Sequence, residues 1–269
     1  MNRMEAAFFD LDKTVISKSS SLALTRPMYR AGLVSRSALL KGAYAQLVYL
    51  LMGADEKKMD RAKESMLALS RGWERGQVED VVREALAELI DPYIYLEAID
   101  LMELHRARGR RVFIVSSSPE EVVRPLAEHF GDVEVIATRV RLKDNRYTGE
   151  LEFYCYGEGK AQAIAETAAT QGLDLSGSYA YSDSITDLPM LEAVGHPVAV
   201  NADRELRREA ERRGWQIRDF RGPVRLRERL PQVPAPGPSV AAVVAGTVAL
   251  ILGWVYLRRL ASGRRDSRG

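Results

Sequence analysis

Cysteine and histidine are scarce in this 269-residue chain. There is one cysteine, Cys155, and the three histidines stand far apart, at His105, His129 and His196. A lone cysteine excludes an intrachain disulfide, so nothing points to an oxidising compartment. Zinc sites need several histidine or cysteine ligands, and the sequence offers no such cluster. The residues therefore indicate neither a disulfide framework nor a zinc centre.

The start of the chain lacks the basic segment and apolar run of a secretory signal peptide, so we expect none. Low-complexity bulk is also missing, and a composition of 46% hydrophobic and 28% charged residues is typical of a globular protein. A chain of this length can hold one core of ordinary size and a smaller module.

Short apolar runs alternate with helical patterns along most of the chain. Strands are predicted at residues 4–10, 112–115, 133–137, 179–182 and 197–200, with an edge strand at 215–217. Residues 138–156 alternate apolar and polar around Asp144 and Asn145, which predicts a β-hairpin. Helices are predicted from about residue 91 to Gly109, from Lys160 to Gly172, and at 204–213. This alternation predicts an α/β fold with a doubly wound, mainly parallel sheet.

Residues 19–90 have a different pattern of apolar residues. Their apolar residues recur at helical spacing, with almost no β-branched clusters, so we predict an all-helical module inserted after the first strand. One part of it, residues 44–52 (YAQLVYLLM), is unusually apolar. This part either packs the module's own core or forms an apolar wall or a membrane-facing patch.

Two carboxylates, Asp10 and Asp12, end the first predicted strand. Their spacing places both on the same face, at the edge where open α/β sheets bind ligands. Crowded carboxylates repel each other unless a cation lies between them, and Mg²⁺ prefers oxygen ligands. One carboxylate could then attack phosphorus while the other handles a proton. The simpler alternative is that Asp-Leu-Asp opens a turn.

Three further motifs follow later strands, and together they carry a resemblance. The four motifs read DLDKT, IVSSS, GKAQAI and SDSITDLPM, and they contain Asp10 with Asp12, Ser116, Lys160, and Asp183 with Asp187. In this order they resemble the haloacid dehalogenase superfamily of phosphatases, over about residues 4–220. The closer resemblance is to its phosphoserine-phosphatase-like branch, whose helical cap lies between the first and second motifs.

This resemblance implies a role for each motif. Asp10 would be the nucleophile that forms an aspartyl-phosphate, and Asp12 the general acid and base. Ser116 would hydrogen-bond the transferring phosphoryl group, and Lys160 would neutralise its charge.

The resemblance also implies a metal and further contacts. Mg²⁺ would be held by the Asp10 carboxylate, the Asp12 backbone carbonyl and Asp183, with Asp187 holding the ion's waters or Lys160. Thr14 and Ser117 would help to bind substrate, and Thr14 would orient Asp12 or its loop. The substrate would be a small phosphorylated molecule, and a lipid-like one is an alternative.

Three features depart from the branch's pattern. Thr186 stands where the branch usually has asparagine, and Lys13 replaces a frequent glycine. Phosphoserine phosphatases carry a glutamate shortly after the first motif, where this chain has only Ser-Lys-Ser-Ser-Ser at residues 17–21. Phosphoserine is therefore a doubtful substrate.

The chain changes again after about residue 220. From Arg204 to the end there are fifteen arginines, no lysine and six acids, a charge of +9; the net charge of +2 leaves −7 for the preceding residues. Residues 221–238 are rich in proline and arginine and are predicted to be a linker. Residues 239–257 (SVAAVVAGTVALILGWVYL) carry no charge and would span roughly 28 Å as a helix. We predict a transmembrane helix, with a buried core helix as the alternative.

The flanks of this segment bear on location and partners. Arginines lie on both sides in nearly equal numbers, so the positive-inside rule decides little. The missing signal peptide favours a single-pass protein of the cell membrane with a cytoplasmic catalytic domain. The arginines can face anionic lipid headgroups, so we expect no nucleic acid partner. The small pairs Ala242/Gly246 and Ala249/Gly253 allow a homodimer through the span.

The predicted organisation has five parts. Residues 1–18 and 91–220 form the haloacid dehalogenase-like catalytic core, 19–90 the helical cap, 221–238 the linker, 239–257 the transmembrane helix and 258–269 a basic tail. The predicted function is a membrane-tethered, Mg²⁺-dependent phosphomonoester hydrolase. Alternatives are a phosphoserine phosphatase proper, a phosphatase of lipid-linked phosphates, and a non-catalytic membrane-tethered adaptor.

Overall fold

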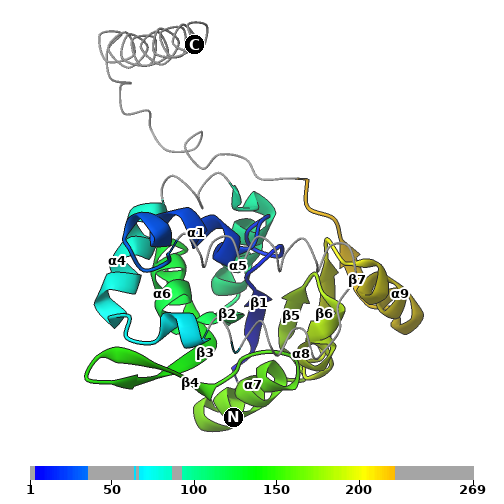
Figure 1. Cartoon of the computed structure of the whole chain (residues 1–269). Coiled ribbons are helices and arrows are strands. Elements are labelled where there is room, and N and C mark those ends of the chain that lie inside the picture. Colours follow the sequence, from blue (N-terminus) through cyan, green and yellow to red (C-terminus); the bar gives the residue numbers. More distant parts are fainter. Residues whose placement is uncertain (1–3, 36–63, 65–66, 87–92, 222–269) are drawn as a thin grey trace, which may run out of the picture. The chain divides into compact units, whose positions relative to one another are not determined.

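A computed structural model describes residues 4–35, 64, 67–86 and 93–221 of the chain (Figure 1). Outside these residues lie the whole of the predicted apolar cap segment at 44–52, the predicted linker after residue 221, the predicted transmembrane helix and the basic tail. No helix within the described ranges is long and apolar enough to cross a membrane. The predicted span at 239–257 is therefore neither supported nor excluded.

A seven-stranded sheet forms the centre of the described part, in the order β4-β3-β2-β1-β5-β6-β7 (Figure 1). All neighbouring strands are parallel except β3 and β4, which are antiparallel. The strand bounds are β1 Ala6–Asp10, β2 Arg111–Pro119, β3 Glu134–Lys143, β4 Arg146–Phe153, β5 Tyr179–Ser182, β6 His196–Val200 and β7 Gln216–Arg218. The predicted α/β class with a mainly parallel sheet is confirmed.

Strand β1 is buried on both faces, which explains why it reads as a continuous apolar run. Its side chains alternate between the two faces: Ala7 and Phe9 join one hydrophobic cluster, and Ala6 and Phe8 join the other. Phe9 stacks on Tyr181 of β5, with 4.3 Å between ring centroids. This packing fixes the strand that ends in Asp10.

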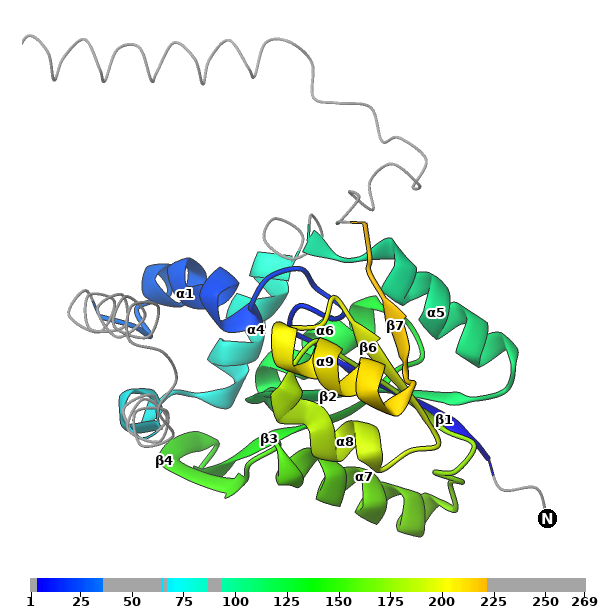
Figure 2. The same ribbon diagram turned by 90° about the vertical axis from the view of Figure 1, so that its right-hand side faces the viewer.

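Helices cover the two faces of the sheet in two groups (Figure 2). Helices α5 (Leu96–Ala107) and α6 (Glu120–His129) pack on the face of Phe9, and α7 (Glu158–Gln171), α8 (Leu188–Glu192) and α9 (Arg204–Arg213) on the face of Phe8. The chain runs outward from β1 through β2 to β3, and then outward the other way from β5 to β7. In open α/β sheets ligands bind at such a reversal, which lies here at the carboxyl ends of β1 and β5; we call this place the crevice.

Two described helices belong to the predicted cap, α1 (Ser20–Arg30) and α4 (Arg75–Ala85). They pack against each other, and α4 packs against α6 of the core. Leu24 and Met28 of α1 and Val78 and Val82 of α4 extend the same hydrophobic cluster that contains Phe9. The cap helices are therefore joined to the core by buried apolar surface.

Two strand predictions need correction. The predicted strand at 133–137 and the first arm of the predicted hairpin are one continuous strand, β3. The hairpin turn lies at Asp144 and Asn145 as predicted; both have positive φ, 50° and 60°, which these two residue types tolerate. Strand β2 runs four residues beyond the predicted 112–115, so Ser116 lies within it, next to an irregularity between Ser116 and Pro119.

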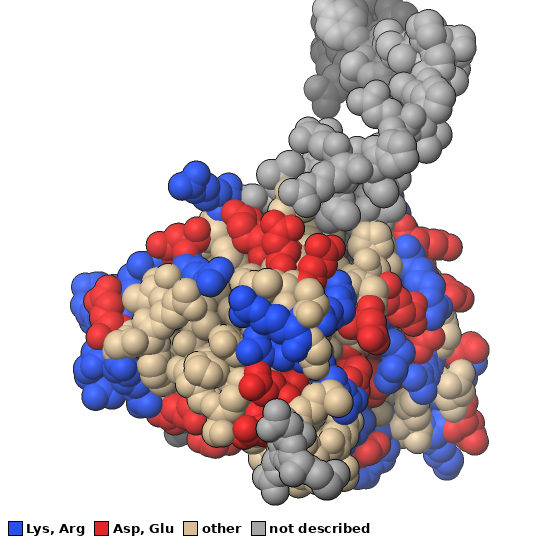
Figure 3. All heavy atoms as spheres, turned by 180° about the vertical axis from the view of Figure 1, so that it is seen from behind, with Lys and Arg blue, Asp and Glu red and all other residues tan. Residues whose placement is uncertain are grey.

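The surface carries mixed charge. Figure 3 shows basic and acidic side chains interspersed over the face opposite to that of Figure 1. Several exposed ions are paired along the strands of the β3–β4 hairpin, such as Arg139 with Glu152 and Arg141 with Glu150. Exposed pairs of this kind contribute little stability, typically less than about 1 kcal/mol each. The ion pairs that matter for function lie in the crevice.

Candidate active site

Asp10 is the last residue of β1 and is only 7% exposed. The turn that follows is tight: the N–H groups of Val15 and Ile16 both donate to the Leu11 carbonyl, and Lys13 has a φ of 62°. Asp12 lies in this turn, two residues beyond the end of β1, so its position is set by the turn and not by the alternation of a strand.

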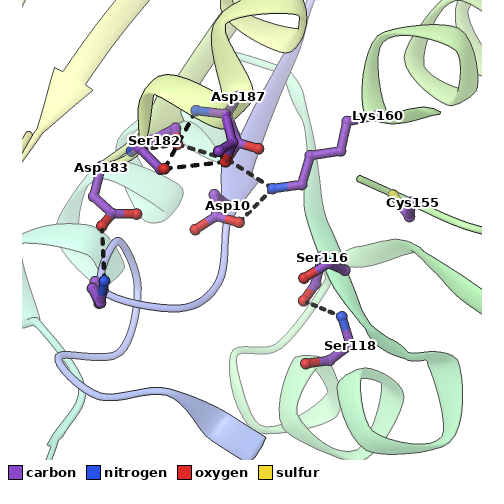
Figure 4. A network of polar contacts seen from close by, with 12 residues as sticks. Asp10, Ser116, Ser118, Cys155, Lys160, Ser182, Asp183 and Asp187 are labelled. Carbon is purple, nitrogen blue, oxygen red and sulfur yellow. Dashed lines mark hydrogen bonds and ion pairs between the residues drawn. The ribbon is translucent and has the colours of Figure 1, made fainter. Parts of the chain in front are cut away.

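Lys160 is the nearest cation to Asp10. It lies at the start of α7 and is 2% exposed, and its Nζ is 2.6 Å from Oδ1 of Asp10 (Figure 4). Helix α7 can start this close to the end of β4 because residue 159 is glycine. A Cβ at Gly159 would collide with the carbonyl oxygen of Tyr154. A single glycine thus lets the helix place the lysine beside the end of β1.

The same ammonium group also binds Asp187. Lys160 Nζ is 2.7 Å from Oδ2 of Asp187, which also accepts a hydrogen bond of 2.7 Å from the Ser182 hydroxyl. Ser182 ends β5, and Asp187 ends the short 3₁₀ helix at Ile185–Asp187. Three segments distant in sequence, around residues 10, 160 and 187, therefore meet in one buried network (Figure 4).

Burial and the neighbouring charges both shift the pKa values of the residues in this network. Burial raises the pKa of Asp10 above its ordinary value, the Lys160 ammonium opposes this, and the neighbouring Asp187 and Asp183 add to it. Burial alone would lower the pKa of Lys160, but Asp10 and Asp187 raise it above the ordinary lysine value. The lysine is therefore protonated, and it must compensate more than one carboxylate.

Asp183 supplies another acid at the neighbouring strand end. It directly follows β5 and is 7% exposed, and its Oδ2 is 3.9 Å from Nζ of the exposed Lys13. Burial raises the pKa of Asp183 to about 6, and Asp187 adds to this while Lys13 opposes it. At neutral pH this carboxylate favours a partner of positive charge.

The chemistry of these donors fits Mg²⁺. Within the described ranges, no three side chains from aspartate, glutamate, histidine or cysteine form a ready-made metal cage. Mg²⁺ does not need one, because it usually takes one or two carboxylates and keeps waters and phosphate oxygens as its other ligands. Asp10 and Asp183 lie at the ends of paired strands, and the buried Lys160 with the exposed Lys13 does not balance the three carboxylates of Asp10, Asp183 and Asp187. A hard dication would complete the balance.

Asp12 is held by the cap rather than by the core. Its Oδ1 accepts a 2.9 Å hydrogen bond from the N–H of Ser20, the first residue of α1. Thr14, predicted to orient Asp12 or its loop, is fully buried, but its hydroxyl makes no hydrogen bond to any part of the chain that the structure describes. The structure thus assigns the contact with Asp12 to Ser20, and substrate binding by Thr14 stays a prediction.

Ser116 lies near the end of β2, next to β1. It is 2% exposed, and its hydroxyl accepts a 3.2 Å hydrogen bond from the N–H of Ser118. Thr138 of β3 donates to the carbonyl of Ser117 at 2.8 Å and so fixes the same turn. The Ser117 side chain, predicted to contact substrate, is exposed. Figure 4 shows Ser116 and Ser118 on the strand end beside Asp10.

Comparison with known families identifies this arrangement. The family model described as haloacid dehalogenase-like hydrolase matches residues 7–192, more than half of the chain. The chain belongs to this family.

Individual relatives agree with the family match. A protein of Mycobacterium tuberculosis named as a probable phosphatase is 50% identical over 259 residues, which cover 95% of this chain and 90% of that protein. A solved structure of a Bordetella pertussis protein of unknown function is 31% identical, with a TM-score of 0.72 over 81% of this chain and 99% of its own. A phosphoserine phosphatase, solved as a phospho-aspartyl intermediate analogue, shares the fold with a TM-score of 0.57 at 18% identity, over 85% of this chain and 99% of its own. The chain is a phosphatase of the haloacid dehalogenase type.

In this haloacid dehalogenase-like hydrolase the four predicted motifs converge, and four more residues join them. Those not predicted are Ser20, Ser118, Thr138 and Ser182. All four are buried hydroxyl residues that hold another site residue in place. The sequence carried one signal for two of them, since serines cluster at residues 17–21 and 116–118. It gave no means of choosing which serine faces the site.

Proposed function

We propose that this phosphatase hydrolyses phosphomonoesters in a Mg²⁺-dependent reaction through an aspartyl-phosphate on Asp10, while tethered to a membrane by residues 239–257. The main support for this reaction is the position of Lys160, whose Nζ lies 2.6 Å from Oδ1 of Asp10 and 2.7 Å from Oδ2 of Asp187. Lys160 holds one oxygen of Asp10, so the second oxygen, Oδ2, is the candidate nucleophile.

Two displacement steps follow from this geometry. In the first, Oδ2 of Asp10 attacks phosphorus, the bond from phosphorus to the ester oxygen breaks, and Asp12 donates its proton to that oxygen. In the second, the Asp12 carboxylate takes a proton from water, the water oxygen attacks phosphorus, and the bond to Asp10 breaks. Inorganic phosphate leaves, and both carboxyl groups return to their initial states.

Residues around the phosphoryl group balance its charge. Lys160 is protonated and buried beside Asp10, where a cation stabilises the transferring group most. Ser116 would donate its hydroxyl proton to a phosphoryl oxygen. Mg²⁺, held by Asp10 and Asp183 with the backbone carbonyl of Asp12, would neutralise charge on the phosphoryl oxygens.

The cap bears on the choice of substrate. The segment at residues 17–21 supplies serines and a lysine rather than a glutamate, and Ser20 is committed to buried contacts with Asp12 and Ser118. No acidic group in this segment is available to bind the amino group of phosphoserine. We therefore place phosphoserine behind other phosphomonoesters, including those of lipid-like alcohols.

The catalytic proposal is tested by replacing Asp10. Asp10→Asn removes the nucleophilic carboxylate while keeping its size, and we expect hydrolysis of 4-nitrophenyl phosphate to fall by at least about 10³-fold. Asp132→Asn, which changes an exposed aspartate outside the site, is the matched control and should keep full activity. Activity of Asp10→Asn within a few-fold of wild type would refute the assignment. EDTA should abolish wild-type activity, and excess Mg²⁺ should restore it.

The membrane tether is tested by placing charges in the predicted span. Val244→Arg with Val248→Arg puts two charges on one helix face, each costing about 2.5–3.5 kcal/mol near the centre of a membrane helix. We expect the wild-type chain in the membrane fraction after alkaline carbonate extraction and the double variant in the soluble fraction. Equal extraction of both chains would contradict the tether. Equal hydrolysis of 4-nitrophenyl phosphate by both would show that the catalytic domain is intact.

A further inference from the structure

Ser20 occupies an unusual place between the cap and the catalytic turn. It is the first residue of α1, eight residues after Asp12, and is fully buried. Buried serines need hydrogen-bond partners, because an unpaired hydroxyl costs about 1–3 kcal/mol. The partners of Ser20 are two groups of the active site.

The first partner is Asp12. The first turn of a helix has free N–H groups, and the side chain of the N-cap residue usually accepts a hydrogen bond from one of them. In α1 the residue at the N-cap position, Ser19, makes no such side-chain bond. Instead the Ser20 N–H donates to Oδ1 of Asp12 at 2.9 Å. The residue proposed as general acid thus takes the place of a cap for this helix.

The second partner lies on the other side of the crevice. The Ser20 hydroxyl is 3.1 Å from the hydroxyl of Ser118, and both side chains are buried. The N–H of Ser118 in turn donates to Ser116. Ser20 therefore connects Asp12, on the turn after β1, with the Ser116–Ser118 turn at the end of β2, across 98 residues of sequence.

We propose that Ser20 is a positioning residue: its hydroxyl, anchored to Ser118, fixes the N-terminus of α1 so that its N–H holds Asp12 at the angle needed to protonate the leaving oxygen. This inference rests on the proposed function, because it assigns the general acid to Asp12.

The role has a signature that a purely structural serine would lack. A general acid matters most when the leaving group is a poor one. Benzyl phosphate and 4-nitrophenyl phosphate carry similar rings, but benzyl alcohol is a far weaker acid and leaves only when protonated. The ratio kcat/KM reports formation of the phospho-enzyme, the first irreversible step. Loss of positioning should therefore reduce kcat/KM for the benzyl ester selectively.

The test compares wild type with Ser20→Ala, Ser118→Ala and the double variant on both esters. We expect Ser20→Ala to lower kcat/KM about tenfold for benzyl phosphate and less than about threefold for 4-nitrophenyl phosphate. The double variant should lose no more than the larger single loss, because both changes remove the same hydrogen bond. Ser20→Thr, which keeps the hydroxyl, should restore most of the benzyl activity. Ser70→Ala, which removes a buried cap hydroxyl that donates to the nearby Leu67 carbonyl, is the control and should leave kcat/KM for both esters unchanged.

Each other outcome overturns the proposal. If Ser20→Ala lowered kcat/KM equally for the two esters, Ser20 would be a structural residue. If kcat/KM changed for neither ester, Ser20 would have no role in the reaction. Losses that multiply in the double variant would show that Ser20 and Ser118 act separately. Should Ser20→Ala not fold, Ser118→Ala removes the other end of the same bond and decides the question. A wild-type protein that hydrolyses neither ester would instead refute the proposed function, and this inference with it.

Discussion

The two sides of the crevice are built from different chemistry. On one side, Lys160 joins Asp10 and Asp187 in a buried network of full charges, all from the core. On the other side, Ser20 and Ser118 link Asp12 to the β2 turn through neutral hydroxyls and N–H groups. The charged side contacts no described cap residue in this network, whereas the hydroxyl side passes through the first helix of the cap.

The difference separates two tasks. Charged hydrogen bonds are about twice as strong as neutral ones, and breaking a buried ion pair is costly, so Lys160 holds the Asp10 carboxylate firmly in the free protein. The bond between the hydroxyls of Ser20 and Ser118 joins two neutral groups and, at about 1 kcal/mol, is easier to break and reform. The side that includes the cap is therefore the one whose contacts can change without unfolding the core.

The largest effect is expected from breaking the charged side. Lys160→Met keeps much of the chain length but removes the charge, leaving Asp10 and Asp187 buried without a cation. We expect kcat/KM for 4-nitrophenyl phosphate to fall by about 10³-fold or more. Lys143→Met, at an exposed position at the end of β3, is the matched control and should be silent. A loss of less than tenfold for Lys160→Met would place the essential cation elsewhere.

The second expected effect is a pH dependence of stability that arises from Asp183, which follows β5 next to the charged side. Burial raises the pKa of Asp183 to about 6, so in EDTA the folded protein binds this proton more tightly than the unfolded chain. The resulting stabilisation is complete below about pH 4 and is lost as pH rises through 6, at a cost of up to about 3 kcal/mol in the free energy of unfolding.

Urea unfolding at several pH values measures this effect. Asp183→Asn cannot titrate, so its unfolding free energy should fall less than that of wild type between pH 4 and 7. Adding Mg²⁺ at pH 7.5 should stabilise wild type and have little effect on the variant. Parallel pH curves for the two proteins would show that Asp183 is not the perturbed group.

The smallest effect is expected on the hydroxyl side, from Thr138→Val. The Thr138 hydroxyl donates to the Ser117 carbonyl and accepts from the N–H of Cys155, so valine leaves two backbone groups unpaired. We expect a loss of about 1–3 kcal/mol in unfolding free energy and at most about a tenfold loss in kcat/KM. Thr148→Val, on the exposed part of the same hairpin, is the control. A loss as large as that of Lys160→Met would erase the distinction between the two sides.

The charged side could be predicted from sequence because its residues, each a weak signal alone, stand in an order of motifs that resembles the haloacid dehalogenase superfamily. Asp10, Lys160, Asp183 and Asp187 each follow a strand or open a helix, and parallel strands bring those positions to one edge. Burying acids and a lysine together has few explanations other than a site. The mainly parallel sheet and the hairpin turn followed from local patterns of this kind.

The hydroxyl side could not be predicted because serine and threonine are common and serve many local turns. The role of Ser20 depends on a contact with a residue 98 positions away, and that of Thr138 on the register of β3 against β2. Thr14 is the opposite case, a residue that the motif singled out. It was predicted to orient Asp12 or its loop, but in the structure the hydrogen bond to Asp12 comes from Ser20. Such contacts are set by tertiary packing, which local sequence does not encode.

The central claim is that Asp10 itself carries the phosphoryl group during turnover. Rapid acid quenching of the enzyme with ³²P-labelled benzyl phosphate, followed by peptide mapping, measures this directly. The account predicts an acid-stable, alkali-labile label on the peptide that contains Asp10, and none in Asp10→Asn. Steady hydrolysis of the ester by wild type with no label on that peptide, or with label on another residue, would contradict it.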